Sequence, residues 1–453
     1  MCLVRAPSAC YRFAPHLNTF MKTLWLATIF FVSLAHAENW GQWRGSDFNG
    51  SSSESDSPVK FSKTENVVWH APLPGPSGAT PAIWGDAVFV SSIDSQNKSR
   101  VALCLDRKTG KIKWQQDMGP GVSQDGNSNF ASPSPVTDGQ VVYFYYGNGD
   151  LACFDMDGKK VWSRNIQKDY GPFAYQWTYS ASPLLYQSKL YIEVLQRNVA
   201  VNGRGNPHND SYLLALDPKT GKELWKHVRP SDAVAESLEA YSTPIPYTHN
   251  GRAELLITGG DCITGHDPET GKELWRWGTW NPQKIGHWRL VPSPVAGSGV
   301  ALACGPKNSP VTAVKLGKNG NLSDSDLAWH STDRDVTSDV PTPLFYKGKF
   351  FILNGGKKKL LCIEPADGKV FWSGDLETRS VFESSPTAAG DKIYMMDHAG
   401  KVFVVSAAPD QFKLLASPTM GDEGDTRLRA SIPISQGQLF IRTGKSLYCV
   451  GKK

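Results

Sequence analysis

Charged and aromatic side chains recur in this sequence shortly before a Ser-Pro or Thr-Pro pair, and they are the residues best placed to do chemistry. Mixed charge beside aromatic rings is what a site for a polar ligand or a peptide needs. Each charged candidate lies two to four positions before such a pair or its looser variants. The candidates are Trp177, Glu239, Arg289, Asp339, Glu383 and Arg429.

Recognisable catalytic motifs are missing from the sequence. It contains no G-x-S-x-G turn, no H-E-x-x-H motif and no C-x-x-C spacing, so no nucleophile or metal site is identified by motif. We therefore assign no catalytic residue and no metal ligand. Structural salt bridges and solvated loops remain the alternative explanation for each charged candidate.

A repeated turn sets the positions of these candidates. Asp217-Pro218-Lys219-Thr220-Gly221 is followed four residues after its Gly by Trp225, and the same Gly-to-Trp spacing recurs at Trp114, Trp162, Trp275 and Trp372. Asp can bond backbone groups two residues on, Pro fixes φ, and Gly accepts the positive φ that ends the turn. Apolar runs of strand length precede the copies, so the pattern predicts hairpins.

A second series of residues runs in phase with the first. A Ser or Thr before Pro opens an apolar strand, and a turn and a second strand follow, so each unit holds four strands. A Pro at the start of a strand removes no hydrogen bond from inside the sheet. The series is Thr80, Ser134, Ser182, Thr243, Ser293, Thr342 and Ser385, with Ser431 as a looser eighth member.

These units resemble the repeats of the pyrroloquinoline-quinone-like (PQQ-like) β-propellers, whose hallmark is A-x-D-x-x-T-G-x-x-x-W. The resemblance covers residues 61–453 and implies an all-β fold of eight four-stranded antiparallel blades. It also implies that the motif Trp residues dock between neighbouring blades and that the segments before the inner strands line a central funnel. The docking residues are Trp69, Trp114, Trp162, Trp225, Trp275, Trp329 and Trp372, with Leu415 in the eighth position.

The two ends of the propeller complete each other. Asn66–Trp69 has a docking Trp but no motif before it, and the chain ends on an apolar run, 446–450, with no Trp after it. We therefore predict that one blade takes its outer strand from the N-terminal side and its other strands from the C-terminus. Such closure leaves no free sheet edge.

The N-terminal residues predict export. Residues 1–37 resemble a signal peptide with an upstream extension, a start at Met21 and cleavage after Ala37. Cleavage would lower the formal charge from +5 to +2, which argues against a nucleic-acid partner, and the apolar stretch is too short to span a membrane. We expect a periplasmic or extracellular monomer. Residues 38–60 form an N-terminal segment whose Trp40 and Trp43 we expect to pack on the propeller side.

The cysteines of the expected mature chain follow the repeat. Cys104, Cys153 and Cys362 lie two residues before their motif acid, where other copies carry Ala or Gly, and Cys449 closes the series. Free Cys behaves as a small buried residue, so we expect these four to be unpaired. Cys262 and Cys304 lie outside this register, and a bond between them remains open.

Two functional classes follow from the resemblance. Quinoprotein dehydrogenases of this fold hold PQQ with a calcium ion, a stacked Trp and a disulfide between adjacent cysteines, but this sequence has no Cys-Cys pair and no C-x-x-C-H haem site. The fold alone does not bring the cofactor, so the cofactor is left unknown. We predict a binding or scaffold protein for a protein or small polar ligand, with a PQQ- and calcium-dependent oxidoreductase as the alternative.

Overall fold

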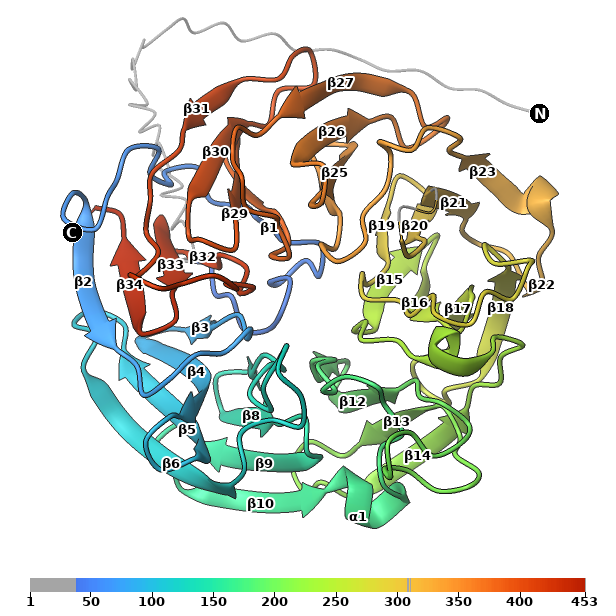
Figure 1. Ribbon diagram of the computed structural model, residues 1–453, viewed down its shortest axis with the longest axis horizontal. Coiled ribbons are helices and arrows are strands. Elements are labelled where there is room, and N and C mark those ends of the chain that lie inside the picture. The colour runs from blue at the N-terminus through green and yellow to red at the C-terminus, as the bar shows by residue number, and fades with distance from the viewer. Residues whose placement is uncertain (1–37, 308, 310, 453) are drawn as a thin grey trace, which may run out of the picture. The chain divides into compact units, whose positions relative to one another are not determined.

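The computed structural model describes residues 38–307, 309 and 311–452, which form eight sheets around one axis. Figure 1 shows the sheets as blades of a propeller viewed along this axis. The predicted eight-bladed propeller of four-stranded antiparallel blades is confirmed. In the described part of the chain, no helix is long and apolar enough to cross a membrane. The signal peptide predicted in residues 1–37 lies outside the described residues.

Blades are numbered here in chain order. In blades 1 to 7 the four antiparallel strands run in sequence from the axis outwards, whereas blade 8 takes its outermost strand from before blade 1. Blade 3 is followed by a 3-10 turn at Ala235–Leu238, and the short helix α1, Ile166–Tyr170, follows blade 2. Blade 1 consists of β3 (Ala82–Trp84), β4 (Ala87–Asp94), β5 (Ser99–Asp106) and β6 (Ile112–Pro120), and blade 2 consists of β7 (Val136–Thr137), β8 (Val141–Tyr145), β9 (Asp150–Asp155) and β10 (Lys160–Asn165). Blade 3 consists of β11 (Leu184–Tyr186), β12 (Lys189–Val194), β13 (Tyr212–Leu216) and β14 (Glu223–Val228). Blade 4 consists of β15 (Ile245–His249), β16 (Arg252–Gly259), β17 (Cys262–His266) and β18 (Glu273–Gly278).

Within the described residues, two blades gain a fifth, parallel strand. β22 (Gly320–Asn321) pairs with β18 at the outside of blade 4, and β1 (Ser51–Ser52) pairs with β28 at the inside of blade 7. A second 3-10 turn, Asp324–Asp326, precedes β23. Blade 5 consists of β19 (Val295–Gly297), β20 (Val300–Cys304), β21 (Val311–Lys315) and β23 (Leu327–His330), and blade 6 consists of β24 (Leu344–Tyr346), β25 (Lys349–Asn354), β26 (Lys359–Ile363) and β27 (Val370–Asp375). Blade 7 consists of β28 (Thr387–Ala389), β29 (Lys392–Met396), β30 (Val402–Ser406) and β31 (Leu414–Ala416). Blade 8 consists of β32 (Ile434–Ser435), β33 (Gln438–Arg442), β34 (Ser446–Val450) and β2 (Val67–Pro72).

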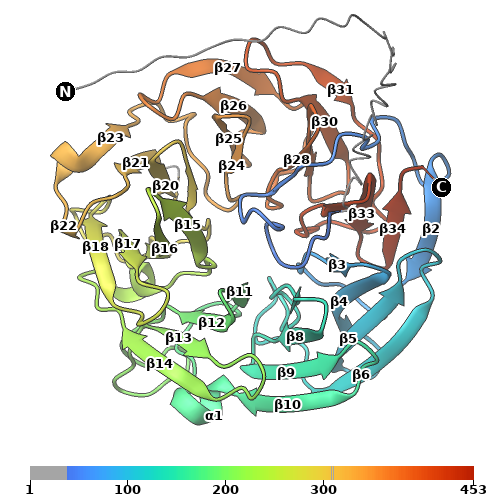
Figure 2. The same ribbon diagram turned by 180° about the vertical axis from the view of Figure 1, so that it is seen from behind.

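Blade 8 joins the two ends of the propeller. β2 pairs antiparallel with β34, with Trp69 opposite Cys449 and Pro72 opposite Ser446. The predicted closure is therefore confirmed, and β2 supplies the outer strand that the C-terminal residues lack (Figure 2). Because the outer strand comes from before blade 1, the ring is closed by hydrogen bonds between residues far apart in sequence.

The motif turns form as their residues dictate. In the turn after β13, the Asp217 carboxylate accepts hydrogen bonds from the Lys219 and Thr220 amides at 2.8 and 2.9 Å, and the Gly221 amide donates to the Asp217 carbonyl at 2.8 Å. Gly221 has φ +69°, a conformation that Gly adopts without the cost other residues bear. The turns at Asp106 and Asp267 repeat this geometry.

Most motif Trp residues lie on the motif turn of the next blade. The Trp114 indole of blade 1 donates to the Met156 carbonyl of blade 2 at 2.9 Å, and a Cβ on Gly158 would lie 2.6 Å from the Trp114 ring. The motif Gly is therefore the residue that leaves room for the ring. The indoles of Trp69, Trp162, Trp329 and Trp372 donate in the same way to Arg107, Pro218, Pro365 and Ala408.

Two positions depart from the predicted pattern. The Trp275 indole donates to the Glu254 carboxylate of its own blade at 2.5 Å, because the next unit, Lys315–Gly320, lacks the Asp that forms a docking turn. In blade 7 the residue at the Trp register is Ala416, which pairs with Val404, and not Leu415. The difference arises because the turn before β31 is longer than the motif turns: the Ser406 amide donates to the Lys413 carbonyl, whereas in blade 3 the Asp217 amide donates to the Lys222 carbonyl.

The cysteine positions follow from the same register. Cys104 is directly opposite Trp114, and Cys153, Cys362 and Cys449 are opposite Trp162, Trp372 and Trp69. A small side chain is required there because the cross-strand neighbour is the largest residue. Across the described range, all six cysteines are buried free thiols, including Cys262 and Cys304.

Candidate functional site

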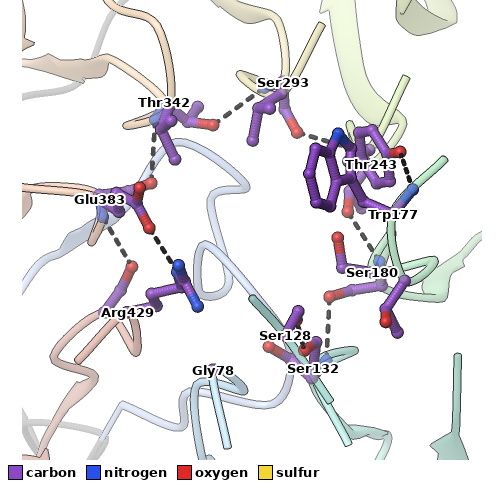
Figure 3. Close-up of a pocket in the computed structure, with 18 of the residues that line it drawn as sticks. Gly78, Ser128, Ser132, Trp177, Ser180, Thr243, Ser293, Thr342, Glu383 and Arg429 are labelled. Atoms are coloured by element: carbon purple, nitrogen blue, oxygen red, sulfur yellow. Dashed lines mark hydrogen bonds and ion pairs between the residues drawn. The ribbon is translucent and has the colours of Figure 1, made fainter. Parts of the chain in front are cut away.

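A closed ring of hydrogen bonds surrounds the propeller axis. The hydroxyl oxygen of each member of the predicted Ser/Thr series accepts a hydrogen bond from the backbone N–H of the member in the preceding blade. The N···O distances lie between 2.8 and 3.2 Å. The last bond, from the Ser431 amide to the Thr80 hydroxyl, joins blade 8 to blade 1. We call these eight residues the hydroxyl ring, and all of them are at most 7% exposed. Figure 3 shows the part of the ring formed by Thr243, Ser293 and Thr342.

A cavity of about 540 Å³ lies on the axis, and seven of the eight ring residues line it. The charged groups in its wall are Arg289, Arg427, Arg429, His398 and Glu383. Its aromatic groups are Trp43, Trp177 and Tyr241. A volume of this size accommodates a small ligand or a few peptide residues.

Four of the six residues predicted from sequence line this cavity: Trp177, Arg289, Glu383 and Arg429. They come from segments of four different blade junctions, each just before an inner strand. Figure 3 shows Glu383 and Arg429 together on one side of the cavity and Trp177 on another. The segments before the inner strands therefore meet around one opening.

Glu239 lies behind the wall and does not line the cavity. It is fully buried, contacts Arg197 at 2.5 Å and accepts hydrogen bonds from the Tyr241 hydroxyl and the Gln176 amide at 2.6 and 3.0 Å. Burial raises its pKa, although these hydrogen bonds act to lower it. Glu239 thus holds Tyr241 and the loop that carries Trp177.

Asp339 is half-buried and does not line the cavity. Its carboxylate accepts the Lys307 amide at 2.8 Å and caps the loop between β20 and β21. The neighbouring Val340 lines the cavity instead. Asp339 is therefore not part of the cavity lining, and its carboxylate is held by the β20–β21 loop of blade 5.

Glu383, Arg429 and His398 form a charged cluster in the cavity wall. The Arg429 Nε donates to the Glu383 carboxylate, and His398 Nε2 lies 3.1 Å from the same oxygen. Burial acts to raise the Glu383 pKa, but the His398 and Arg429 contacts outweigh it and lower the pKa to about 2. Arg429 and His398 thus both contact the one carboxylate in the wall.

Trp177 and Arg289 share a second acid. The Trp177 indole donates to Glu236 at 3.1 Å, and Arg289 Nε lies 3.9 Å from the same oxygen. The Trp177 amide also donates to the Tyr241 hydroxyl at 3.2 Å. The indole is therefore held in place by groups from the neighbouring blade junction.

Sequence reasoning missed the contribution of the N-terminal segment. Residues 40–52 contact the inner strands of blades 1, 2, 3, 6 and 7, and the segment crosses near the centre in Figure 2. Trp43 reaches the cavity instead of packing on the propeller side, whereas Trp40 is buried against blade 1. The short W-x-Q-W-R-G stretch carries no periodicity that would place it on the axis.

The cavity does not fit a quinone held by calcium. Calcium takes six to eight oxygen ligands, mostly carboxylates, and Glu383, the one carboxylate in the lining, is engaged by Arg429 and His398. Over the described ranges, no group of three or more His, Cys, Asp or Glu could hold a metal ion. No two cysteines are adjacent in the sequence, so the disulfide ring of the quinoproteins is not available.

The fold and the site place this chain in the class of eight-bladed β-propellers with a polar cavity on the axis. A family model described as outer membrane protein assembly factor BamB matches residues 51–200, 196–327 and 321–452. The chain is a member of that family of PQQ-like repeat propellers.

Relatives of known activity match parts of the chain. A polyvinylalcohol dehydrogenase of Pseudomonas sp is 24% identical over 168 residues, which are 35% of this chain and 24% of the relative. Quinohemoprotein alcohol dehydrogenase ADH IIB of Pseudomonas putida is 25% identical over 34% of this chain and 26% of its own length. The matched part of this chain thus spans about a quarter of each dehydrogenase.

Solved structures share the fold over most of the chain. Quinohemoprotein alcohol dehydrogenase from Comamonas testosteroni superposes with a TM-score of 0.63 at 14% identity, over 92% of this chain and 81% of its own. BamB from Moraxella catarrhalis gives 0.58 at 13% identity, over 85% of this chain and 99% of its own. At such identities the likeness establishes the fold and leaves the role to the site.

Proposed function

We propose that this protein is an exported scaffold that binds a partner protein at the mouth of the axial cavity. The observation that carries the proposal is the pairing of charged groups in the cavity wall. Glu383, Arg429 and His398 are bound to one another, and Glu236 is bound to Trp177 and lies close to Arg289. Groups held in this way recognise a ligand with little loss of freedom.

Export is supported by the environment of Glu38. Its backbone nitrogen lies 3.1 Å from the Glu54 carboxylate. Cleavage after Ala37 would turn this nitrogen into an ammonium group beside that carboxylate, an attractive pair. N-terminal sequencing of the protein from a fractionated cell is expected to begin at Glu38, and an N-terminus elsewhere would contradict this cleavage site.

The scaffold proposal is tested by site-specific crosslinking in the native host. A photoreactive phenylalanine analogue replaces Trp177 in the cavity wall, and a matched variant carries it at Val161, which is 50% exposed on the outer strand β10. We expect one discrete protein adduct from position 177 and none from 161. Equal labelling at both positions, or none at 177, would contradict the proposal.

The alternative, a quinoprotein-type oxidoreductase, is addressed by titrating the purified protein with PQQ and calcium. We expect no saturable quinone fluorescence change and no dye-linked alcohol oxidation, because the wall lacks the carboxylates for calcium. Tight, calcium-dependent binding followed by turnover would replace the scaffold proposal with the enzymatic one.

A further inference from the structure

The hydroxyl ring has unused hydrogen-bond donors. Every ring oxygen accepts one backbone N–H, and within residues 38–307, 309 and 311–452 no ring hydroxyl donates to any acceptor. A hydroxyl carries one donor hydrogen in addition to its acceptor sites, and buried donors in proteins are almost always satisfied. Seven of these hydroxyls line the same cavity, so their hydrogens favour a ligand that offers acceptors on the axis.

A buried cation lies close to the ring on the side of the N-terminal segment. Arg44 is 1% exposed, and its guanidinium donates to the carbonyls of Pro343 and Pro386 at 2.9 and 2.8 Å, the residues that directly follow ring members Thr342 and Ser385. Its Nε has no partner in the described part of the chain. Burial lowers the Arg44 pKa to about 9, which still leaves the group charged at neutral pH. A buried charge with neutral partners favours an anion nearby.

The mouth of the cavity carries a second cation that lacks an acidic partner. Arg427 is exposed and donates to the Gly126 carbonyl and the Asn127 side chain, and no carboxylate of the described residues lies within 4.0 Å of it. Arg429 and Arg289 already face Glu383 and Glu236. The lining thus has three guanidiniums and one imidazole against a single carboxylate.

We propose that the cavity binds an acidic peptide segment of the partner protein, with one carboxylate over the hydroxyl ring and another at Arg427. The inference rests on the proposed scaffold function and names the chemistry of its ligand. A carboxylate offers only acceptors, which complements both the free hydroxyl hydrogens and the guanidiniums. The Trp177 ring, part-exposed in the wall, provides a surface for the apolar atoms of the same segment.

The test measures binding of two labelled peptides by fluorescence anisotropy. The first is an acetylated, amidated hexapeptide of alternating Glu and Gly, and the second replaces each Glu with Gln. We expect the Glu peptide to bind at least tenfold more tightly, with an affinity that falls as salt is raised. Equal affinities for the two peptides would overturn the inference, and so would a free dicarboxylate such as glutarate that binds as tightly as the Glu peptide.

Variants assign the binding to the proposed groups. Arg427→Gln, at an exposed side chain, is expected to weaken the Glu peptide at least fivefold, whereas Lys113→Gln on the exposed face of β6 leaves it unchanged. Ser293→Ala removes a ring hydroxyl and is expected to weaken binding, and Ser293→Thr restores it. An unchanged affinity in both Arg427→Gln and Ser293→Ala would overturn the inference. Crosslinking at position 177 would be unaffected by that result, so failure of the acidic ligand and failure of the scaffold function are distinguishable.

Discussion

Replacement of one motif glycine by alanine should separate the contact between blades from the strain within a turn. Gly368 of blade 6 has φ +76°, and a Cβ there would lie 2.7 Å from the Trp329 ring of blade 5. Gly348 of the same blade has φ +73°, and a Cβ there would have no atom within 4 Å. Gly348→Ala thus reports the backbone strain alone, about 1–2 kcal/mol.

Gly368→Ala adds a steric term to the same strain. Carbon atoms pack best at about 3.5–4.0 Å, so the Trp329 ring must move by about 1 Å. Overpacking costs about 1–3 kcal/mol, and the displacement also strains the 2.8 Å hydrogen bond from the Trp329 indole to the Pro365 carbonyl, which contributes about 0.5–1.5 kcal/mol. We expect Gly368→Ala to lose about 2 kcal/mol or more beyond the loss in Gly348→Ala.

The assay is urea unfolding followed by tryptophan fluorescence, with the loss of stability taken from the shift of the midpoint. Both variants should keep the far-ultraviolet circular dichroism spectrum of the parent. If the two variants lose the same free energy within about 0.5 kcal/mol, which is near the error of such a comparison, the Trp329 ring does not hold blades 5 and 6 together as the structure indicates.

Three further predictions concern the ring closure, the thiols and a buried acid. A chain ending at Gly444 lacks β34, whose Leu447, Cys449 and Val450 are fully buried. Its free energy of unfolding should fall by several kcal/mol, since burying one large apolar side chain contributes about 1.5–3 kcal/mol. A melting temperature equal to that of the full chain would contradict this prediction. Iodoacetamide should label Cys262 before the other described cysteines, because its Sγ accepts hydrogen bonds from Arg229 and Arg276 at 3.1 and 3.4 Å and lies beside a cavity of about 350 Å³. By contrast, burial raises the pKa of the Cys104 and Cys304 thiols to about 12. Equal labelling of the cysteines in a peptide map would contradict this prediction. Burial raises the pKa of Glu193 to about 8, so the folded state holds this proton more tightly than the unfolded state, and the stabilisation present below about pH 4.5 is lost as the pH rises through 8. The drop in unfolding free energy between pH 5 and 8.5 should therefore be smaller in Glu193→Gln by more than about 1 kcal/mol, and identical pH profiles would refute the assignment.

The fold was predictable because each repeat encodes its own turn chemistry. Asp217 and Gly221 specify one turn whatever surrounds them, and the Ser and Thr residues before proline mark where each inner strand begins. Exceptions occur where the code is broken or shifted. Trp275 turns to Glu254 because the following unit has no docking turn, and a longer turn between Ser406 and Lys413 puts Ala416 at the position expected for Leu415.

The site was predictable only as far as strand position determines side-chain direction. Arg289, Glu383 and Arg429 reach the cavity because their segments enter the inner strands along the axis. Asp339 and Glu239 occupy equivalent positions, but local partners turn them away. Trp43 reaches the cavity from a segment with no repeat signal, so only the folded chain reveals its place.

The closure of blade 8 has a consequence for how the chain folds as it emerges, N-terminal residues first. Among the described strands β1 and β2 come first in sequence, yet β2 pairs with β34, which comes after all the others, and β1 and Arg44 contact blades 6 and 7. A chain that emerges in this order carries an open sheet edge until β34 is available, and such non-local pairing is slow and exposed to aggregation. The earliest residues of the described chain should be the last to become protected from hydrogen exchange.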